Sequence, residues 1–213
     1  MKRRITDIQA QKKNPSRRSI FLDGEYFCGV SEEVAVRFHL RKGLEIDEEK
    51  LRELLHEEEL SKAKSYVYRI LARRMYTVKE IRNKLVERGY IGEIIEDVIT
   101  TLERHGYLND RVFAEEWILS RMRSKPRGKI ALRQELARKG IDKAIIENAL
   151  SQAFNESDEK EKEMALDLAR RKIESYRGDD PRAVRRKLRG FLLRRGFDFD
   201  TVRNVIEQVM EQK

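Results

Sequence analysis

The chain has 213 residues, of which 39% are hydrophobic and 40% are charged. This composition supplies core material for small helical modules but little for a large buried sheet. Lys and Arg total 47 against 38 Asp and Glu, which gives a formal net charge of +9. The surplus favours a polyanionic partner such as nucleic acid, and a highly charged, solvated helical surface is the alternative interpretation.

The cysteine content and the lack of long apolar runs bear on the compartment. A single cysteine, Cys28, excludes an intramolecular disulfide and fits a reducing environment. No apolar run approaches the roughly 20 residues needed to span a bilayer. The basic start of the chain also lacks the apolar stretch of a signal peptide. We therefore expect a cytoplasmic protein without a membrane partner.

The first 45 residues predict a small β-structure followed by a short helix. Asp23 and Gly24 lie between two aromatic-rich segments, and an Asp-Gly pair in that setting is typical of a two-residue hairpin turn. A strand near residues 5–8 can join the hairpin. Ser31 fits the N-cap of a short helix that ends near Gly43. Because so small a sheet is marginal alone, we expect it to pack on helices.

The next segment, residues 46–62, is predicted as a solvated connecting helix. It holds seven acids between Asp47 and Glu59 and contains neither Gly nor Pro. Three leucines supply a narrow apolar stripe. The absence of breaking residues allows one long helix, or a pair of helices, to run from here into the following segment.

One pattern then occurs three times: an aliphatic residue, Arg, two variable residues, Leu, three residues and Gly. The closing glycines are Gly89, Gly140 and Gly196. Tandem units of about fifty residues indicate a helical array. A capping box at residues 77–80 begins a helix that ends at the first glycine, which suits the left-handed cap position. Each unit is therefore predicted as three short helices, over residues 63–108, 109–154 and 155–213.

The third unit differs from the first two at its beginning. Residues 155–163 are rich in Glu, Asp and Lys and are predicted as a helix-to-helix connection, so that repeat 3 proper begins near Met164. Its middle helix has Asp180 as the expected N-cap and Pro181 at the first helical position, where the missing N–H costs nothing.

Catalytic and metal-binding patterns are not found. His39, His56 and His105 lie in different contexts, with no cysteine or second histidine at metal-ligand spacing, which favours structural roles for all three. The chain has no phosphate loop and no GxSxG, HExxH or kinase pattern. We predict a protein that is not an enzyme, with no catalytic residue, metal or cofactor.

Basic residues carry more information. Between residues 170 and 195 there are eleven Lys and Arg against three acids. A helix here can bury one face and offer four guanidinium groups on the next face, and arginine suits phosphate because its planar fork makes two bonds at once. The predicted nucleic-acid or filament-binding residues are Arg82, Arg133, Arg182, Arg185, Arg186, Lys187, Arg189 and Arg194.

Two alternatives to nucleic-acid contact stay open at this point. Arginine stems can simply cover apolar surface on a solvated face, and for Arg82 and Arg133 the two interpretations are equal. Aromatic side chains of repeats 1 and 2 could stack on bases, although their helical spacing favours the core. These aromatics are Tyr66, Tyr68, Tyr76, Tyr90, Tyr107 and Phe113.

Several short motifs follow one another in a distinctive order through repeats 1 and 2. They are Leu71-Ala72-Arg73-Arg74, Arg88-Gly89-Tyr90, Gly106-Tyr107-Leu108-Asn109-Asp110 with Phe113-Ala114, Arg127-Gly128, Leu132-Arg133-Gln134-Glu135-Leu136 and Lys139-Gly140-Ile141. In this order and spacing they resemble the RecX family of recombinase regulators. The resemblance is strong over residues 63–153 and looser in repeat 3, whose middle helix carries more positive charge than the family pattern.

The resemblance implies a mainly α fold: tandem three-helix repeats in an elongated, curved array, with a small N-terminal β-hairpin region. It implies a non-enzymatic modulator of the RecA recombinase in DNA repair and the SOS response. Such proteins lie in the groove of the RecA filament and limit its growth, recombination and ATP hydrolysis. The expected partners are the RecA filament and single-stranded DNA, with double-stranded DNA left open, and the expected state is a monomer. The alternative is a DNA-binding transcriptional regulator, since three-helix units can resemble helix-turn-helix domains.

Overall fold

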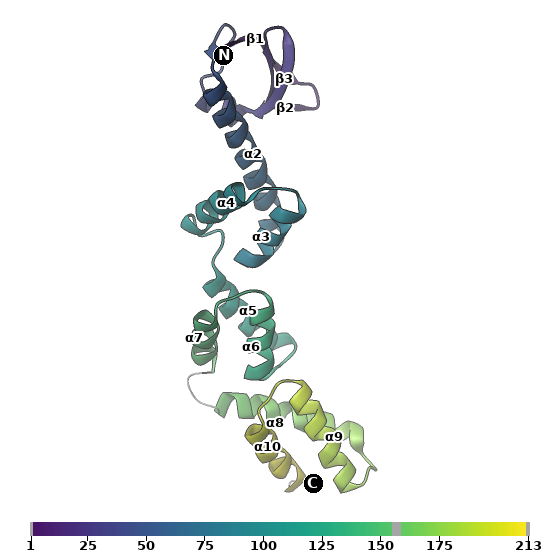
Figure 1. Ribbon diagram of the computed structural model, residues 1–213. Helices are drawn as coiled ribbons and strands as arrows, with labels where there is room; N and C mark the ends of the chain where they lie inside the picture. Colours follow the sequence, from purple (N-terminus) through teal and green to yellow (C-terminus); the bar gives the residue numbers. More distant parts are fainter. Residues whose placement is uncertain (1, 155–158, 212–213) are drawn as a thin grey trace. The chain divides into compact units, whose positions relative to one another are not determined.

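The computed structural model describes residues 2–154 and 159–211 (Figure 1). The chain divides into two units. The first comprises Met1–Arg74 with Ile81–Tyr107, and the second comprises Met75–Glu80 with Leu108–Lys213. In neither part of the described chain is any helix both long and apolar enough to cross a membrane.

The first unit begins with an antiparallel sheet in the order β3-β2-β1-β4. Its strands are β1 (Arg3–Gln11), β2 (Asn14–Leu22), β3 (Glu25–Ser31) and β4 (Glu45–Ile46). Asp23 and Gly24 have φ angles of 54° and 91°, as a two-residue turn of the hairpin type requires. The predicted hairpin and the strand around residues 5–8 are therefore confirmed, and β4 adds a short fourth strand.

Helix α1 (Glu32–Arg37) follows the sheet directly. The Ser31 hydroxyl accepts a hydrogen bond from the Val34 N–H at 3.2 Å, which confirms the predicted N-cap. The prediction that this helix reaches nearly to Gly43 is wrong. It stops at Arg37, because His39 adopts a φ of 51° that a helix cannot contain.

The long helix α2 (Glu48–Leu71) runs through the acidic segment into the first repeat. Leu51 and Leu54, near its start, are buried against the sheet, and Ala63 and Val67 are buried further along. The acidic segment is thus the front part of one long helix, which is the first of the two arrangements that the sequence allowed. The helix ends at Leu71. Helices α3 (Val78–Glu87) and α4 (Gly92–Arg104) complete repeat 1.

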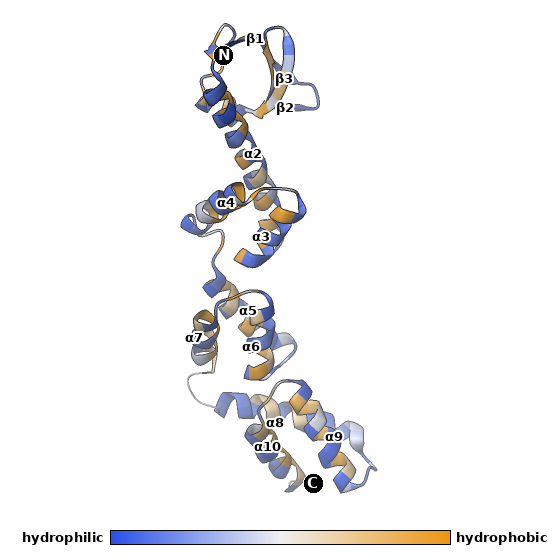
Figure 2. Ribbon diagram, viewed as in Figure 1, coloured by the Kyte–Doolittle hydropathy of each residue, from blue (hydrophilic) through white to orange (hydrophobic). Residues whose placement is uncertain are grey.

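The second unit contains two further three-helix groups (Figure 1). The first group consists of α5 (Asp110–Ser124), α6 (Lys129–Arg138) and α7 (Lys143–Ala153). The second consists of α8 (Glu159–Ile173), a 3-10 turn η1 (Glu174–Tyr176), α9 (Pro181–Arg194) and α10 (Phe199–Glu211). Each group has its own apolar core, and Figure 2 shows hydrophobic and hydrophilic residues alternating along these helices. The predicted mainly helical fold of tandem three-helix repeats is confirmed.

The predicted connection at residues 155–163 needs a correction. Residues 155–158 lie outside the described part of the chain, but residues 159–163 are already helical. Glu159 and Glu161 occupy the first turn of α8, where acidic side chains are favoured by the helix dipole. Their charge was therefore a mark of a helix start rather than of a connection.

The predicted caps are confirmed in detail. In the capping box, the Thr77 N–H donates to Glu80 and the Glu80 N–H donates to the Thr77 hydroxyl, both at 3.2 Å. The three repeat glycines have φ angles of 82°, 84° and 84°. Asp180 accepts from the Ala183 N–H at 3.1 Å and Pro181 is the first residue of α9.

Candidate nucleic-acid interface

Helix α9 has a buried apolar face and an exposed basic face. Val184, Leu188 and Leu192 are fully buried in the core of the third repeat. The predicted basic residues of this helix all lie outside that core and are exposed: Arg182, Arg185, Arg186, Lys187, Arg189 and Arg194. The helix has 14 residues, whereas α3 and α6 have 10, and Arg182 lies in the additional first turn.

The basic residues of α9 differ in whether an acid neutralises them. Lys187 Nζ lies 2.7 Å from Asp179 Oδ2 and 5.4 Å from the centre of the Tyr176 ring. Within the described residues, the side chains of the five arginines on this face have no hydrogen bond or ion pair. Their charge is therefore available to an external anion.

Arg82 and Arg133, by contrast, are each bound to a glutamate of the following helix, at the same sequence separation in both repeats. Arg133 donates from Nε and Nη2 to the two carboxylate oxygens of Glu147, at 2.6 and 2.8 Å. Arg82 also makes two hydrogen bonds to the carboxylate of Glu96, from Nη1 and Nη2. These hydrogen bonds lower the pKa of both glutamates below the ordinary range. The pairs favour a structural role for the two arginines, whose predicted contact with nucleic acid stays a prediction.

Repeat 3 lacks the acid at that position. Arg189 corresponds to Arg133, and the residue at the same separation from it as Glu147 from Arg133 is Arg203. Arg203 is exposed on α10. Arg203 lies 3.4 Å from Asp200, one turn away on the same helix. The third repeat thus replaces a neutral pair by two like charges. Sequence reasoning missed Arg203, although the constant separation within each repeat could have revealed it.

A further group of cations surrounds Phe191, in a depression of about 330 Å³ between α9 and the loop that precedes α6. Lys125, Arg127, Arg194 and Arg195 line it. Arg127 is 3.0 Å from Glu135, and Arg195 donates to the Pro126 carbonyl at 3.2 Å. Lys125 and Arg194 are exposed, without an acidic partner among the described residues. Arg194 is therefore part of a cluster that extends into repeat 2, which the sequence alone did not show.

Four family descriptions match successive parts of the chain. The RecX N-terminal domain matches residues 3–47, and the first, second and third RecX three-helix domains match residues 63–102, 109–150 and 158–206. The regulatory protein RecX of Clostridioides difficile is 31% identical over 97% of this chain and 95% of its own length. The chain belongs to the RecX family.

Other relatives agree over nearly the whole length. The regulatory protein RecX of Leuconostoc mesenteroides is 30% identical over 99% of this chain and 77% of its own. A crystal structure of a regulatory protein RecX superimposes with a TM-score of 0.78, at 28% identity over 99% of this chain and 100% of the other. The structure of RecX from Lactobacillus salivarius gives a TM-score of 0.64, at 26% identity over 70% of this chain and 96% of the other.

In the second unit, one polar contact occurs twice: a backbone N–H at the start of a second helix donates to a carboxylate that opens the next three-helix domain. We call each of these contacts, with the main-chain bonds around it, a polar junction. The Val78 N–H donates to Asp110 at 2.9 Å, and one repeat further on the Lys129 N–H donates to Glu161 at 2.7 Å. In both cases the carboxylate lies at the start of the next repeat and accepts from the free N-terminus of a second helix. Asp110 is half-buried, and burial raises its pKa.

Main-chain groups complete each junction. Thr77 Oγ1 donates to the Lys139 carbonyl at 2.8 Å, and the Gly128 N–H donates to the Arg195 carbonyl at 3.0 Å. The Ile130 N–H also donates to the Gly196 carbonyl at 3.1 Å. A Cβ on Gly128 would overlap the backbone of Gly196, and a Cβ on Gly196 would overlap Ala131. These contacts place the start of α6 beside the end of α9.

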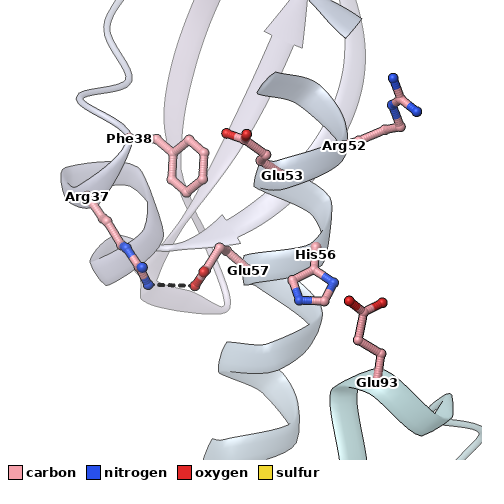
Figure 3. A pocket seen from close by; sticks show the side chains of 7 residues that line it. All are labelled: Arg37, Phe38, Arg52, Glu53, His56, Glu57 and Glu93. Carbon is pink, nitrogen blue, oxygen red and sulfur yellow. Dashed lines mark hydrogen bonds and ion pairs between the residues drawn. The ribbon is translucent and has the colours of Figure 1, made fainter. Parts of the chain in front are cut away.

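A depression of about 500 Å³ in the first unit has mixed charge (Figure 3). Arg37 pairs with Glu57 at 2.6 Å, and His56 lies 3.6 Å from Asp97. Figure 3 also shows Glu93 beside His56. These contacts tie α1 and α4 to α2, which gives His56 a structural role. In the described residues, no three His, Cys, Asp or Glu side chains are grouped to hold a metal ion.

The remaining candidate side chains lie in ordinary structural positions. Burial raises the pKa of the Cys28 thiol to about 11, and the charge of Glu58 adds to the effect, so the nucleophilic thiolate is scarce at neutral pH.

Among the aromatic residues predicted to lie in the core, Phe113 is buried as expected. That interpretation is wrong for Tyr68 and Tyr107, which are 39% and 58% exposed and stack edge to face on each other.

Proposed function

We propose that this RecX protein is a non-enzymatic regulator that binds RecA filaments and DNA. In this proposal it inhibits filament extension, recombination and ATP hydrolysis in DNA repair and the SOS response. Membership of the RecX family supports the regulatory role and the RecA partner. The observation that carries DNA contact is the basic face of α9, whose arginines lack acidic partners in the described chain. We further expect the protein to act as a monomer in the cytoplasm.

The physical argument rests on charge compensation. An arginine that already binds a carboxylate gains little from a phosphate, because it must first give up that partner. The arginines of α9 have no such competitor, and each phosphate contact releases condensed counterions from the nucleic acid. Binding should therefore weaken steeply as salt rises. Phosphate contacts carry no sequence information, which fits a regulator that acts along a filament on any DNA.

The direct test adds the purified protein to RecA on single-stranded DNA. We expect ATP hydrolysis and strand exchange to fall at stoichiometric ratios, and no effect on either would rule out the proposal. A variant with Arg182, Arg185, Arg186 and Arg189 changed to Ala should bind DNA with a log–log salt slope reduced by about 0.7 to 0.9 for each lost contact. An unchanged slope would mean that the face is only solvated.

A matched control removes the same charge elsewhere. Lys12, Lys13, Arg41 and Lys42 are exposed residues of the N-terminal region. Changing these four to Ala lowers the net charge by the same amount but leaves α9 intact. The salt slope of this control should stay near that of the unmodified protein.

The second candidate is a sequence-directed transcriptional regulator, which the three-helix repeats with an exposed basic helix would suit. It differs in one measurable property. A regulator of that kind prefers its own duplex site over random DNA by at least about a thousandfold. We expect this protein to show no such preference in a selection from random duplexes.

A further inference from the structure

A polar depression of about 410 Å³ lies in the first unit, where β2, α2 and the end of α3 meet. Four cations line it, and no carboxylate does. Arg17 comes from β2, Lys62 and Arg69 from α2, and Arg88 follows α3. All its lining residues belong to the first unit, whereas α9 belongs to the second.

Two of the four cations form ion pairs with one buried acid. Glu58 is 2% exposed, and its Oε1 lies 2.6 Å from Arg17 and 3.4 Å from Lys62. Its other oxygen accepts from the Ser31 N–H at 2.7 Å. A carboxylate with so many partners fixes the position of Arg17 but neutralises only one of the four positive charges.

The other two cations have no carboxylate partner in the described chain. The guanidinium of Arg88 lies 3.9 Å from the centre of the Tyr66 ring, and that of Arg69 lies 5.8 Å from it. A ring face orients a guanidinium while leaving its in-plane N–H donors available. Both arginines are exposed at the depression and can turn those donors to a ligand.

Hydroxyl groups and size complete the site. Ser65 adds a hydroxyl donor from α2, whereas the Ser61 hydroxyl, one turn earlier, donates to the Ser31 hydroxyl at 3.2 Å. A further acid, Glu59, acts on Tyr90 through its charge but is exposed and does not line the depression. The volume lies within the roughly 300–1,000 Å³ of small-ligand sites. Arginine forks together with hydroxyl donors are the groups that recognise phosphate oxygens.

We propose that this depression is a phosphate-binding site, with Arg69 and Arg88 as the principal ligands and Arg17 and Lys62 supporting them. The phosphates can belong to a nucleic-acid strand or to a free polyphosphate or nucleotide. This site goes beyond the α9 face of the proposed function. It gives the N-terminal unit an anion contact of its own.

The test titrates the full-length protein with inorganic triphosphate, monitored by the side-chain Nε–H resonances of arginine. We expect Arg69 and Arg88 to shift, and the double variant Arg69→Ala with Arg88→Ala to bind at least tenfold more weakly. The control, Arg73→Ala with Arg104→Ala, removes two exposed arginines of the same unit outside the depression and should bind normally. Binding by the double variant that equals that of the unmodified protein would overturn the proposal.

Further arms identify the source of the phosphate and separate this site from α9. If oligo(dT) displaces triphosphate from Arg69 and Arg88, the site takes a strand; if only ATP does, it takes a free nucleotide. The variant Arg69→Lys with Arg88→Lys keeps the charge without the forks and should bind with intermediate affinity. Triphosphate should still bind to Arg69 and Arg88 when the four α9 arginines are changed to Ala. A failure of the phosphate-site proposal can therefore be distinguished from a failure of the α9 proposal.

Discussion

The second and third three-helix domains have equivalent cores but differ at one pair of surface positions. Leu132 and Leu136 of α6 are fully buried, as are Leu188 and Leu192 of α9. At the surface, Arg133 binds Glu147 in the second domain, whereas the position corresponding to that glutamate in the third is Arg203. The core has to be repeated because each small unit buries the same face. The surface pair is free to change sign, which lets one scaffold carry a neutral or a strongly basic face.

The largest expected effect concerns the glycine that closes the middle helix of each domain. In Gly196→Ala, the new Cβ would overlap the backbone of Ala131, whereas at Gly89 it would meet nothing within 4 Å. Both changes force a positive φ on alanine, at a cost of about 1–2 kcal/mol, but overpacking adds roughly 1–3 kcal/mol at Gly196 only. Urea denaturation measures the difference. Equal losses would show that the close approach between the second and third domains relaxes freely.

The next effect compares the carboxylates of the two polar junctions. Glu161 is 2% exposed and Asp110 is only half-buried. Glu161→Ala leaves the Lys129 N–H without its acceptor in a dry position, and we expect a loss of about 1–3 kcal/mol in unfolding free energy. Asp110→Ala should cost less, because water can reach the Val78 N–H. Thermal unfolding of the two variants side by side checks the order, and the reverse order would contradict it.

A charge exchange tests the surface pair itself. Arg203→Glu places an acid at the position that Glu147 holds in the second domain, and it should neutralise Arg189. We expect the salt slope of DNA binding to fall by about 0.7 to 0.9, the amount for one phosphate contact. Arg133→Ala should leave the slope unchanged, because Glu147 already occupies that side chain. A slope that falls equally in both variants would show that the pairing does not decide DNA contact.

The smallest effect is the titration of Glu147. The hydrogen bond from Arg133 lowers the pKa of this carboxylate below its ordinary value of 4.5. Because the pKa of Glu147 is lower in the folded state than in the unfolded state, its charge stabilises the fold at pH values above the unfolded-state pKa. This stabilisation is lost as the pH falls through the folded-state pKa. In Arg133→Gln the pKa of Glu147 should therefore rise towards 4.5. The NMR signal of the Glu147 side-chain carboxyl carbon, recorded as a function of pH, measures this pKa. An unchanged pKa would mean that the pair does not persist in solution.

Features set by local chemistry were predictable from the sequence. The Asp23-Gly24 turn, the Thr77 capping box and the glycine caps each depend on residues close together in the chain, and the structure confirms them. The three-helix repeats followed from the periodic pattern. The end of α1 at Arg37 was missed because it depends on a left-handed His39, a conformation that non-glycine residues seldom adopt.

Features set by contacts between distant residues were harder to predict. The pairing of Arg82 and Arg133 with glutamates on the following helix, and the cations around Phe191, arise only when helices pack. The arginine cluster of α9 was visible because one helix carries it. Its role in binding stays a prediction, as do the domain boundaries placed at residues 45, 62, 108 and 154.

The junctions of the second unit bear on how such a chain can lengthen. The start of a second helix supplies the donors, at Val78 and again at Lys129. The following repeat supplies the acceptors: a carboxylate opening its first helix and carbonyls closing its second. Donors and acceptors thus recur with the period of the repeat. A gene duplication that copies one whole repeat would copy both halves of the joint with it, so a new segment could attach to its neighbour without any further mutation.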